Sequence, residues 1–430
     1  MTDTIAKSQV NELNIDALSL SMGQRAKRAA KILAASNCEA RSKALALMAQ
    51  QVRAAKDEIL AANSEDVTRA IADKLSPAMI DRLKLDANRL EAIAKGLEEM
   101  SAQGDKVGNV IEEWTRPNGL VMQKVRIPIG TIGIIYESRP NVTADAGGLC
   151  VRSGNSVILR GGSDAFKSST AIANALRAGL KAAGLPEDAI QFVPTTDRAM
   201  VGEMLKGMGG NIDMIVPRGG KSLVARVQNE AKVPVLSHLD GINHTYIHKS
   251  ADEKKAIEVT LNAKMRRTGI CGATETLLID EEIAGDYLPE LAFALSQGGC
   301  ELRGCPKARA IIPMGVANDD DWNTEYLAPI LSVKIVEDIN EAITHIAEHG
   351  SGHTDAIIAE DLAAANKFLA EVDSAIVMHN TSTQYADGGE FGFGGEIGIG
   401  TGRLHARGPV GAEGLTTYKY VVRGAGQVRP

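Results

Sequence analysis

The sequence predicts an α/β protein with two domains, each built around a doubly wound parallel sheet. Three observations predict it. Over the first hundred residues, Ala, Leu and Ile recur every three or four positions with charged residues between them, which indicates amphipathic helices. From residue 131 onward, short apolar stretches alternate with helical stretches, an order typical of βαβ units. The alternation starts again after Gly241, so a domain boundary is expected near residue 240.

The first domain begins with helices, which the apolar spacing predicts over 24–36, 41–63 and 88–103. The segment 108–137 is rich in β-formers, and Pro117-Asn118-Gly119 predicts a hairpin turn between two extended arms. The alternating region then predicts strands over 131–136, 156–160, 189–193, 212–216 and 233–237, and helices over 165–183 and 198–208.

The second domain shows the same alternation. Strands are predicted over 244–248, 274–280, 308–313, 330–336, 354–359 and 374–379, and helices over 252–264, 288–296 and 342–349. The last forty residues are rich in glycine, and 415–424 predicts one terminal strand.

Composition and charge exclude several classes of protein. Hydrophobic residues make up 44% of the chain and charged residues 23%, as in ordinary globular proteins. The formal net charge of -7 argues against a nucleic-acid partner, which would need a basic face to meet its phosphates. The N-terminal segment lacks the apolar core of a signal peptide, and no apolar run approaches the ~18 residues of a membrane span. Five cysteines, an odd number, do not form a disulfide framework, so we expect no membrane partner and a cytoplasmic location.

The common nucleotide and metal motifs are missing. The stretch VPRGGKS ends like a P-loop, but the first glycine of that motif would fall at Ile215, and no G-x-G-x-x-G occurs. A bound dinucleotide would therefore use a variant route. His345 and His349 stand four residues apart, yet no third ligand stands in a recognisable frame. We interpret them as surface or packing histidines, interpret Cys300 and Cys305 as loop cysteines, and predict no metal site.

Four segments together resemble one enzyme family. They are PIGTIGIIYESRPNVTADAGGLCVRSGNSVILRGG, MRRTGICGATETLL, EYLAPILSV and GSGHTDAI, in that order along the chain. Over essentially its whole length the sequence resembles the gamma-glutamyl phosphate reductases, also called glutamate-5-semialdehyde dehydrogenases, of the aldehyde dehydrogenase superfamily. The resemblance implies an NADP-binding Rossmann-like domain over 1–109 and 127–240 and a catalytic domain over 241–403. It also implies an oligomerisation element made of a hairpin at 110–126 and a terminal strand within 404–430.

The resemblance also implies an activity. The family reduces L-glutamyl 5-phosphate with NADPH to L-glutamate 5-semialdehyde and phosphate, the second step of proline biosynthesis from glutamate. A homodimer or homotetramer is implied as well. Because glutamyl phosphate is labile, transient contact with a separate glutamate 5-kinase is a further hypothesis.

Cys271 is the candidate nucleophile. It follows Lys264, Arg266 and Arg267 and has glycines close on both sides, a setting that favours a thiolate because nearby positive charge stabilises ionised sulfur. The alternative for a lone cysteine is packing. The resemblance implies that the Cys271 thiolate attacks the acyl carbon and forms a thioester.

Asn141, in SRPN, matches the superfamily asparagine whose amide faces the developing oxyanion, with the backbone N–H of Cys271 as the second donor. The alternative is a turn asparagine after a proline.

Four residues match cofactor positions of the superfamily. Arg160 ends a predicted strand where the superfamily has a lysine that touches the adenosine ribose, and an arginine can also reach a 2′-phosphate. Gly219 and Gly220 fall at a strand-to-helix turn beside the pyrophosphate, where exposed N–H groups favour an anion. Glu325 matches the glutamate that holds the nicotinamide ribose. The alternatives are a tight turn for the glycines and a solvated surface carboxylate for Glu325.

One departure from the superfamily concerns the water-activating base. Hydrolytic aldehyde dehydrogenases carry a glutamate in an LELGG stretch, whereas the equivalent stretch here is SHLDG, with His238 at that position and Asp240 two residues on. An enzyme whose leaving group is phosphate needs no water activation, so the absence supports phosphate chemistry. A hydrolytic or acylating enzyme for another semialdehyde, and a binding protein without catalysis, remain alternatives.

The substrate implied by the resemblance carries a carboxylate and a phosphate, so its pocket needs cations. The sequence does not divide the candidates between substrate, cofactor and structural ion pairs. They are Arg139, Lys264, Arg267, Arg403 and Arg407.

Overall fold

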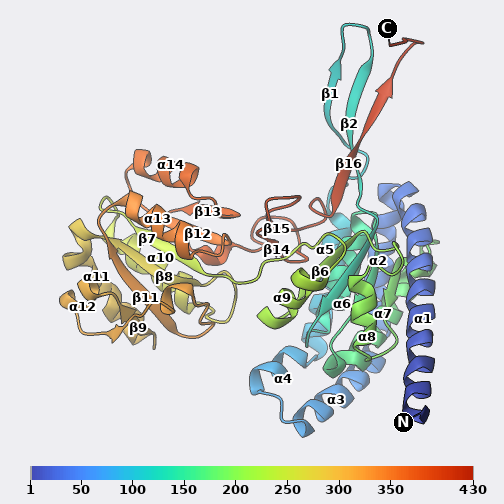
Figure 1. Cartoon of the computed structure of the whole chain (residues 1–430), viewed down its shortest axis with the longest axis horizontal. Coiled ribbons are helices and arrows are strands. Elements are labelled where there is room, and N and C mark those ends of the chain that lie inside the picture. Colours follow the sequence, from blue (N-terminus) through green and yellow to red (C-terminus); the bar gives the residue numbers. More distant parts are fainter. Residues whose placement is uncertain (1, 430) are drawn as a thin grey trace. The chain divides into compact units, whose positions relative to one another are not determined.

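The computed structural model describes residues 2–429 and separates them into two compact units (Figure 1). Unit 1 runs to Ser237 and includes Gly392–Gly398 and the segment from Val410 onward, while unit 2 holds His238–Phe391 and Ile399–Pro409. The glycine-rich region thus belongs partly to each unit, whereas the sequence assigns all of 241–403 to one domain. The backbone explains this: Ile397 donates to the carbonyl of Val410, and Val410 donates to that of Gly398, both at 2.8 Å.

Helices dominate the first part of unit 1, as the apolar spacing predicts. They are α1 (Thr2–Ala35), α2 (Cys38–Ala54), α3 (Lys56–Ala72), α4 (Pro77–Leu83) and α5 (Ala87–Ala102). Side-chain caps set several of their starts: Asn37 accepts from the backbone of Ala40, and Asp86 accepts from that of Arg89.

A four-stranded parallel sheet forms the centre of unit 1, in the order β5-β4-β3-β6. Its strands are β3 (Thr131–Tyr136), β4 (Ser156–Arg160), β5 (Ile190–Phe192) and β6 (Met214–Arg218). The helices between them are α6 (Asn141–Arg152), α7 (Phe166–Ala182) and α8 (Ala199–Leu205), with α9 (Lys221–Glu230) after β6 and short 3-10 turns η1 (Ser163–Ala165) and η2 (Glu187–Ala189). A core on one face joins residues of α1, α8 and α9 to the sheet. The strand order, with the first strand inside the sheet, makes this half doubly wound.

A separate three-stranded antiparallel sheet also belongs to unit 1. The hairpin β1 (Val110–Thr115) and β2 (Val121–Pro128) pairs along β2 with β16 (Thr416–Arg423). Gly119 occupies the turn with a φ of 83°, where a residue with a side chain would be strained. The predicted hairpin and terminal strand therefore form one sheet, which we call the arm sheet (Figure 1).

Unit 2 is built on a seven-stranded parallel sheet in the order β10-β9-β11-β8-β7-β12-β13. The strands are β7 (Asn243–Ile247), β8 (Thr274–Asp280), β9 (Glu301–Gly304), β10 (Gly315–Val316), β11 (Ile330–Val336), β12 (Thr354–Ile358) and β13 (Ile376–His379). The helices are α10 (Glu253–Met265), α11 (Glu281–Gln297), α12 (Pro306–Ile311), α13 (Ile339–His349) and α14 (Leu362–Glu371). Two further strands of two residues each, β14 (Ile399–Gly400) and β15 (Gly408–Pro409), pair with each other. Short turns η3 (Asp321–Asn323) and η4 (Thr383–Tyr385) complete the unit. One apolar core packs α10, α11 and α12 against the sheet, and a second packs α13 and α14.

The predicted α/β fold is confirmed, but two predicted strands are wrong. The stretch 233–237 forms only an isolated bridge between Ile215 and Val235. Pro234 at its centre has no N–H to donate, so a ladder cannot continue through it. The stretch 308–313 lies mostly in α12, which begins with Pro306 in its first turn, a position that favours helix. The missed strands in that region are β9, only four residues long, and β10, only two.

Among residues 2–429, every helix is too short or too polar to cross a lipid bilayer.

Candidate active site

Cys271 lies in unit 2, in the loop between α10 and β8, and is half-buried. The buried side chain of Asn243, at the start of β7, holds this loop. Its Nδ2 donates to the carbonyl of Cys271 at 2.6 Å and to that of Ala273 at 2.9 Å. Its Oδ1 accepts from the backbone of Thr354 at 3.2 Å. The amide therefore ties the cysteine loop to two adjacent strands.

Gly241 lies directly against the backbone of Cys271. A Cβ at Gly241 would stand 2.2 Å from the carbonyl oxygen of Cys271, so only glycine fits there without a shift of the loop. The N–H of Gly241 donates to Oε1 of Glu325 at 3.0 Å. The structure thus links Glu325 and Cys271, two residues that the sequence predicted for the site, through one glycine.

Two histidines stand beside the sulfur of Cys271. One nitrogen of His238, one of His353 and the Cys271 Sγ all lie within 4.8 Å of one another. The two rings are nearly perpendicular, with centroids 5.0 Å apart. Nδ1 of His238 contacts the carbonyl of Ile399 at 2.8 Å, and Nδ1 of His353 contacts Oγ1 of Thr354 at 2.8 Å. Burial lowers the pKa of His353 to about 3, so its imidazole is neutral at physiological pH.

The sheet topology explains why these residues meet. Asn243 begins β7, Cys271 and Ala273 precede β8, and His353 and Thr354 stand at the start of β12. Since β8, β7 and β12 are adjacent and parallel, their amino ends share one edge of the sheet. The candidate site of unit 2 lies at that edge.

Two of the three basic residues before Cys271 have partners other than its sulfur. Lys264 is fully buried, and its ammonium forms an ion pair with the fully buried carboxylate of Glu275. Burial raises the pKa of Glu275, and the charge of Lys264 opposes that shift. Arg266 donates to Oε1 of Gln384 at 3.3 Å, whereas Arg267 is exposed. The sequence interpretation that Lys264 stabilises the thiolate therefore needs correction, because its charge is matched inside the core.

Two further predicted cations share one carboxylate. Arg407 pairs with Asp373 at 2.9 Å, and Arg403 pairs with the same carboxylate. The hydrogen bond from Arg407, with the charge of Arg403, lowers the pKa of Asp373. Two cations against one anion leave this group of side chains with a net positive charge. Their role in substrate binding stays a prediction.

Three of the four candidate cofactor residues, Arg160, Gly219 and Gly220, belong to unit 1, at the carboxyl edge of its sheet, whereas Glu325 belongs to unit 2. Arg160 ends β4, and its guanidinium donates to the carbonyls of Gly161 at 2.9 Å and Thr196 at 3.0 Å. Burial lowers the pKa of Arg160, and the positive charge of Arg198 adds to that effect. Two cations therefore lie near the end of a strand where doubly wound sheets bind nucleotides.

The turn after β6 holds an anion of the chain itself. Gly220 caps α9, and its N–H donates to Oε2 of Glu137 at 2.9 Å. A Cβ at Gly219 would lie 2.5 Å from the same oxygen. A carboxylate thus lies at the start of α9, because the amino end of a helix favours negative charge. A cofactor pyrophosphate placed there would take the position of Glu137.

Asn141 is the first residue of α6 and is exposed. One N–H of its amide donates to Oδ2 of Asp145, one turn later, at 2.9 Å. Burial raises the pKa of Asp145 to about 6, against the effects of Asn141 and Arg218. An amide carries two N–H donors, so this contact fixes the side chain and leaves a second donor for an oxyanion. Arg139, the remaining predicted cation, is half-buried in the turn before α6.

The residues that sequence reasoning missed as site members are Gly241, Asn243 and His353. His353 was present in the segment GSGHTDAI that carried the resemblance, and Gly241 closes the SHLDG stretch, but neither pattern assigns a role. His345 and His349 pack against each other with ring centroids 4.5 Å apart, and His345 is buried. This matches the interpretation of this pair as packing histidines.

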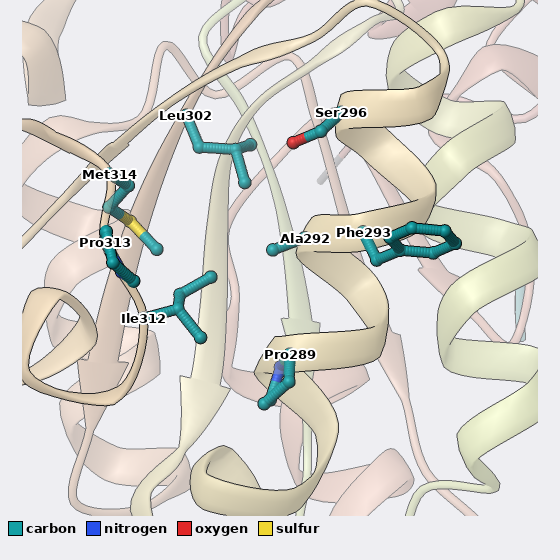
Figure 2. Close-up of a pocket in the computed structure, with 8 residues that line it drawn as sticks. All are labelled: Pro289, Ala292, Phe293, Ser296, Leu302, Ile312, Pro313 and Met314. Atoms are coloured by element: carbon teal, nitrogen blue, oxygen red, sulfur yellow. The ribbon is translucent and has the colours of Figure 1, made fainter.

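One surface pocket of unit 2 lies away from these residues. It has a volume of about 330 Å³ and is lined by residues of α11 and the 312–314 segment, with Leu302 of β9 between them (Figure 2). Ser296 contributes the polar side chain of an otherwise apolar lining (Figure 2). Without titratable groups, this pocket does not suit an anionic substrate.

Comparison with known proteins adds the family. The model of the aldehyde dehydrogenase family matches residues 18–301 and 308–421. Gamma-glutamyl phosphate reductase of Rhizorhabdus wittichii is 60% identical over the whole of both chains, and that of Parvibaculum lavamentivorans is 58% identical over 95% of this chain and 97% of its own.

Solved structures agree with these sequence matches. The crystal structure of gamma-glutamyl phosphate reductase from Thermotoga maritima has a TM-score of 0.94 at 43% identity, covering 96% of this chain and 100% of its own. An acetylating aldehyde dehydrogenase of Geobacillus thermoglucosidasius shares the fold, with a TM-score of 0.67 at 19% identity over 97% of this chain and 99% of its own. The chain therefore belongs to the aldehyde dehydrogenase family and, within it, to the gamma-glutamyl phosphate reductases.

Proposed function

We propose that this protein reduces L-glutamyl 5-phosphate to L-glutamate 5-semialdehyde and phosphate with NADPH, through a thioester on Cys271. Family membership supports the substrate. The observation that carries the chemistry is the position of Cys271, in a loop held by Asn243 and beside the imidazoles of His238 and His353. An imidazole stands where hydrolytic relatives carry a glutamate, so the thioester is protected from a carboxylate-activated water.

The proposed reaction begins at Cys271. The thiol gives its proton to an adjacent imidazole, and the sulfur attacks the acyl carbon of the substrate. The bond from that carbon to the phosphate oxygen breaks, phosphate leaves, and a thioester remains. The thioester carbon would accept a hydride, which NADPH would supply when bound. The thiohemiacetal anion would collapse to the aldehyde and the Cys271 thiolate, which would recover its proton from the imidazole, while the departing phosphate would take one proton from solvent.

Asn141 and the backbone N–H of Cys271 are proposed as the oxyanion donors. The contact with Asp145 holds the amide of Asn141 in one orientation, so no reorganisation is needed when negative charge develops on the acyl oxygen. Asp145 is therefore a positioning residue in this proposal.

The cofactor proposal rests on the carboxyl edge of unit 1. We assign the 2′-phosphate of NADPH to Arg160. Arg198 lies close enough to lower the pKa of Arg160 through charge repulsion, so it adds a second positive charge for the phosphate. The pyrophosphate is assigned to the Gly219–Gly220 turn, which already accepts a carboxylate. Glu325 is assigned to the nicotinamide ribose. In this proposal unit 1 carries Arg160, Gly219 and Gly220, and unit 2 carries Glu325 and the nucleophile.

The remaining assignments concern substrate, assembly and location. Four cations stay as proposed ligands of the anionic substrate: Arg139, Arg267, Arg403 and Arg407. Lys264 is withdrawn because Glu275 neutralises its charge.

We propose a homodimer or homotetramer that assembles through the arm sheet, and a transient contact with glutamate 5-kinase. None of the five cysteines, all of them in the described part of the chain, forms a disulfide, which fits a reducing compartment such as the cytoplasm.

The reverse reaction tests the function. The purified protein receives glutamate semialdehyde and NADP+, with or without inorganic phosphate, and absorbance of the reduced cofactor is followed. We expect reduction of NADP+ only with phosphate, and a loss on the order of 10⁴-fold or more in Cys271→Ala. Cys38→Ala, at a thiol of unit 1, is the control and keeps full activity.

Two outcomes would change the function. Reduction without phosphate would mean that water attacks the thioester, as in a hydrolytic aldehyde dehydrogenase. Reduction that depends on coenzyme A in place of phosphate would establish an acylating enzyme.

A further inference from the structure

The cluster of Cys271, His238 and His353 offers more electron-pair donors than the proposed reaction uses. It offers one sulfur and two imidazole nitrogens, all within 4.8 Å of one another. The reaction needs only one imidazole to receive the thiol proton. Yet both rings are fixed in place by contacts at Nδ1.

The tautomer of His238 and an unpartnered nitrogen of His353 favour metal binding. The carbonyl of Ile399 accepts from an N–H, so Nδ1 of His238 carries the proton and its Nε2 carries the lone pair. In a metal-binding histidine, one ring nitrogen binds the metal and the N–H of the other typically donates a hydrogen bond to a carbonyl or another oxygen. The ring of His353 is fully buried, and its Nε2 has no hydrogen-bond partner among the residues that the structure describes. A buried imidazole nitrogen without a partner is costly unless something occupies it.

We propose that Cys271, His238 and His353 form a site for Zn²⁺ that competes with the acyl substrate for the thiol. Thiolates and imidazoles are zinc ligands, and three protein ligands with a fourth position open to water is the arrangement of catalytic zinc sites. Binding releases one proton: the S–H bond of Cys271 breaks, a sulfur–zinc bond forms, and no electrons are transferred. The chemistry excludes Mg²⁺ and Ca²⁺, which prefer oxygen ligands.

The required movement is small. About 2.3 Å from zinc to sulfur and about 2.0 Å from zinc to nitrogen place tetrahedral ligands about 3.3 to 3.6 Å apart. Rotation of the half-buried Cys271 side chain about its Cα–Cβ bond can shorten the two sulfur–nitrogen distances, while Asn243 keeps the loop backbone in place. The two imidazole nitrogens, which lie within 4.8 Å of each other, reach the required spacing through small shifts of the rings.

Metal binding is measured first with Co²⁺, on the full-length protein freed of metal by a chelator. We expect one cobalt ion per chain and a near-ultraviolet thiolate-to-cobalt charge-transfer band. Cys271→Ser abolishes the band, and His353→Gln, which preserves a buried polar side chain, weakens binding at least tenfold, since even outer-shell losses cost about 10–100-fold. Cys38→Ala and His405→Ala are the matched controls and bind cobalt like the unaltered protein.

Alkylation of Cys271 provides a second readout that a structural role would not change. We expect Zn²⁺ to slow its reaction with iodoacetamide and a chelator to restore the rate. Cobalt bound without the thiolate band, or equal affinity in His353→Gln, would overturn the site.

The competition with substrate rests on the proposed function, and activity separates the two proposals. If Zn²⁺ protects Cys271 from iodoacetamide and inhibits the reductase reversibly, both stand. If it protects Cys271 but leaves the activity intact, the metal site stands and the nucleophile role of Cys271 fails.

Discussion

Single residues around Cys271 set the geometry of its loop. Gly241 allows the chain before β7 to touch the cysteine backbone, and Asn243 holds two carbonyls of the loop with one amide. Neither residue carries chemistry of its own. Their effect on the reaction is positional, and such effects are large because a displacement of about 1 Å at a reacting atom can cost about 10²-fold in rate.

Gly241→Ala tests this positional role. A methyl group 2.2 Å from the carbonyl oxygen of Cys271 must push the loop away, so we expect kcat/KM to fall about 10²-fold or more. Overpacking also costs about 1–3 kcal/mol in the free energy of unfolding, measured by urea denaturation. Gly285→Ala, in α11 with nothing within 4 Å of the added methyl, is the control and keeps its activity. Full activity in Gly241→Ala would show that the loop position does not matter.

At the scale of elements, α6 combines a proposed catalytic amide with a half-buried carboxylate. Asn141 and Asp145 are four residues apart, so they lie on the same face of the helix. The hydrogen bond between them is local and depends on α6 alone. Partial removal of Asp145 from water disfavours its charged form and raises its pKa to about 6.

This raised pKa predicts how stability changes with pH. The folded protein holds the Asp145 proton up to about pH 6, whereas the unfolded chain releases it near its ordinary value of about 3.9. The contribution of Asp145 is therefore fully present below about pH 4 and is lost as the pH rises through about 6. Asp145→Asn removes this dependence, so the difference in unfolding free energy between the two proteins changes over that window.

Urea denaturation at several pH values measures the difference. Asp86→Asn is the control: the backbone hydrogen bond from Arg89 lowers the pKa of Asp86, so its contribution changes only at more acidic pH. A constant difference for Asp145→Asn between about pH 4 and 6 would contradict the raised pKa.

For the whole molecule, the arm sheet is the feature that points to assembly. Tyr418, Tyr420 and Val422 alternate along β16 and so share one face, and each is exposed by 46% or more. The strand lies at an open edge of its sheet. Trp114 of β1 contacts Tyr420 edge to face, with centroids 6.1 Å apart, which extends the apolar surface across the sheet. Exposed aromatic patches and open edges are typical of protein–protein interfaces.

The double variant Tyr420→Lys, Val422→Lys places two charges on this face. We expect it to shift the molar mass measured by light scattering from an oligomer toward a monomer, because charges are costly in an interface core. Leu362→Lys, at an exposed apolar residue of α14, is the control and leaves the mass unchanged. A double variant that keeps the mass of the unaltered protein would exclude the arm sheet as the assembly surface.

The sequence alone determined most of the fold and supplied the candidate residues of the site. Apolar periodicity located the long helices and nearly all central strands, because burial of one helix face or of a whole strand leaves a direct pattern. It failed at Pro234 and in α12, where a missing N–H and a proline at a helix start outweigh apolar content. Cys271, Asn141 and Glu325 stood out through the family resemblance, and their roles stay predictions.

Only the tertiary structure decided which residues surround Cys271. His238, Cys271, Glu325 and His353 precede β7, β8, β11 and β12, and these strands are neighbours in the order β11-β8-β7-β12, which differs from their order along the chain. The parallel sheet gathers their amino ends at one edge. Likewise, the sequence gives Lys264 a charge near the cysteine, but folding buries it against Glu275. Composition and spacing indicate which side chains are present, whereas strand order and burial determine which of them come into contact.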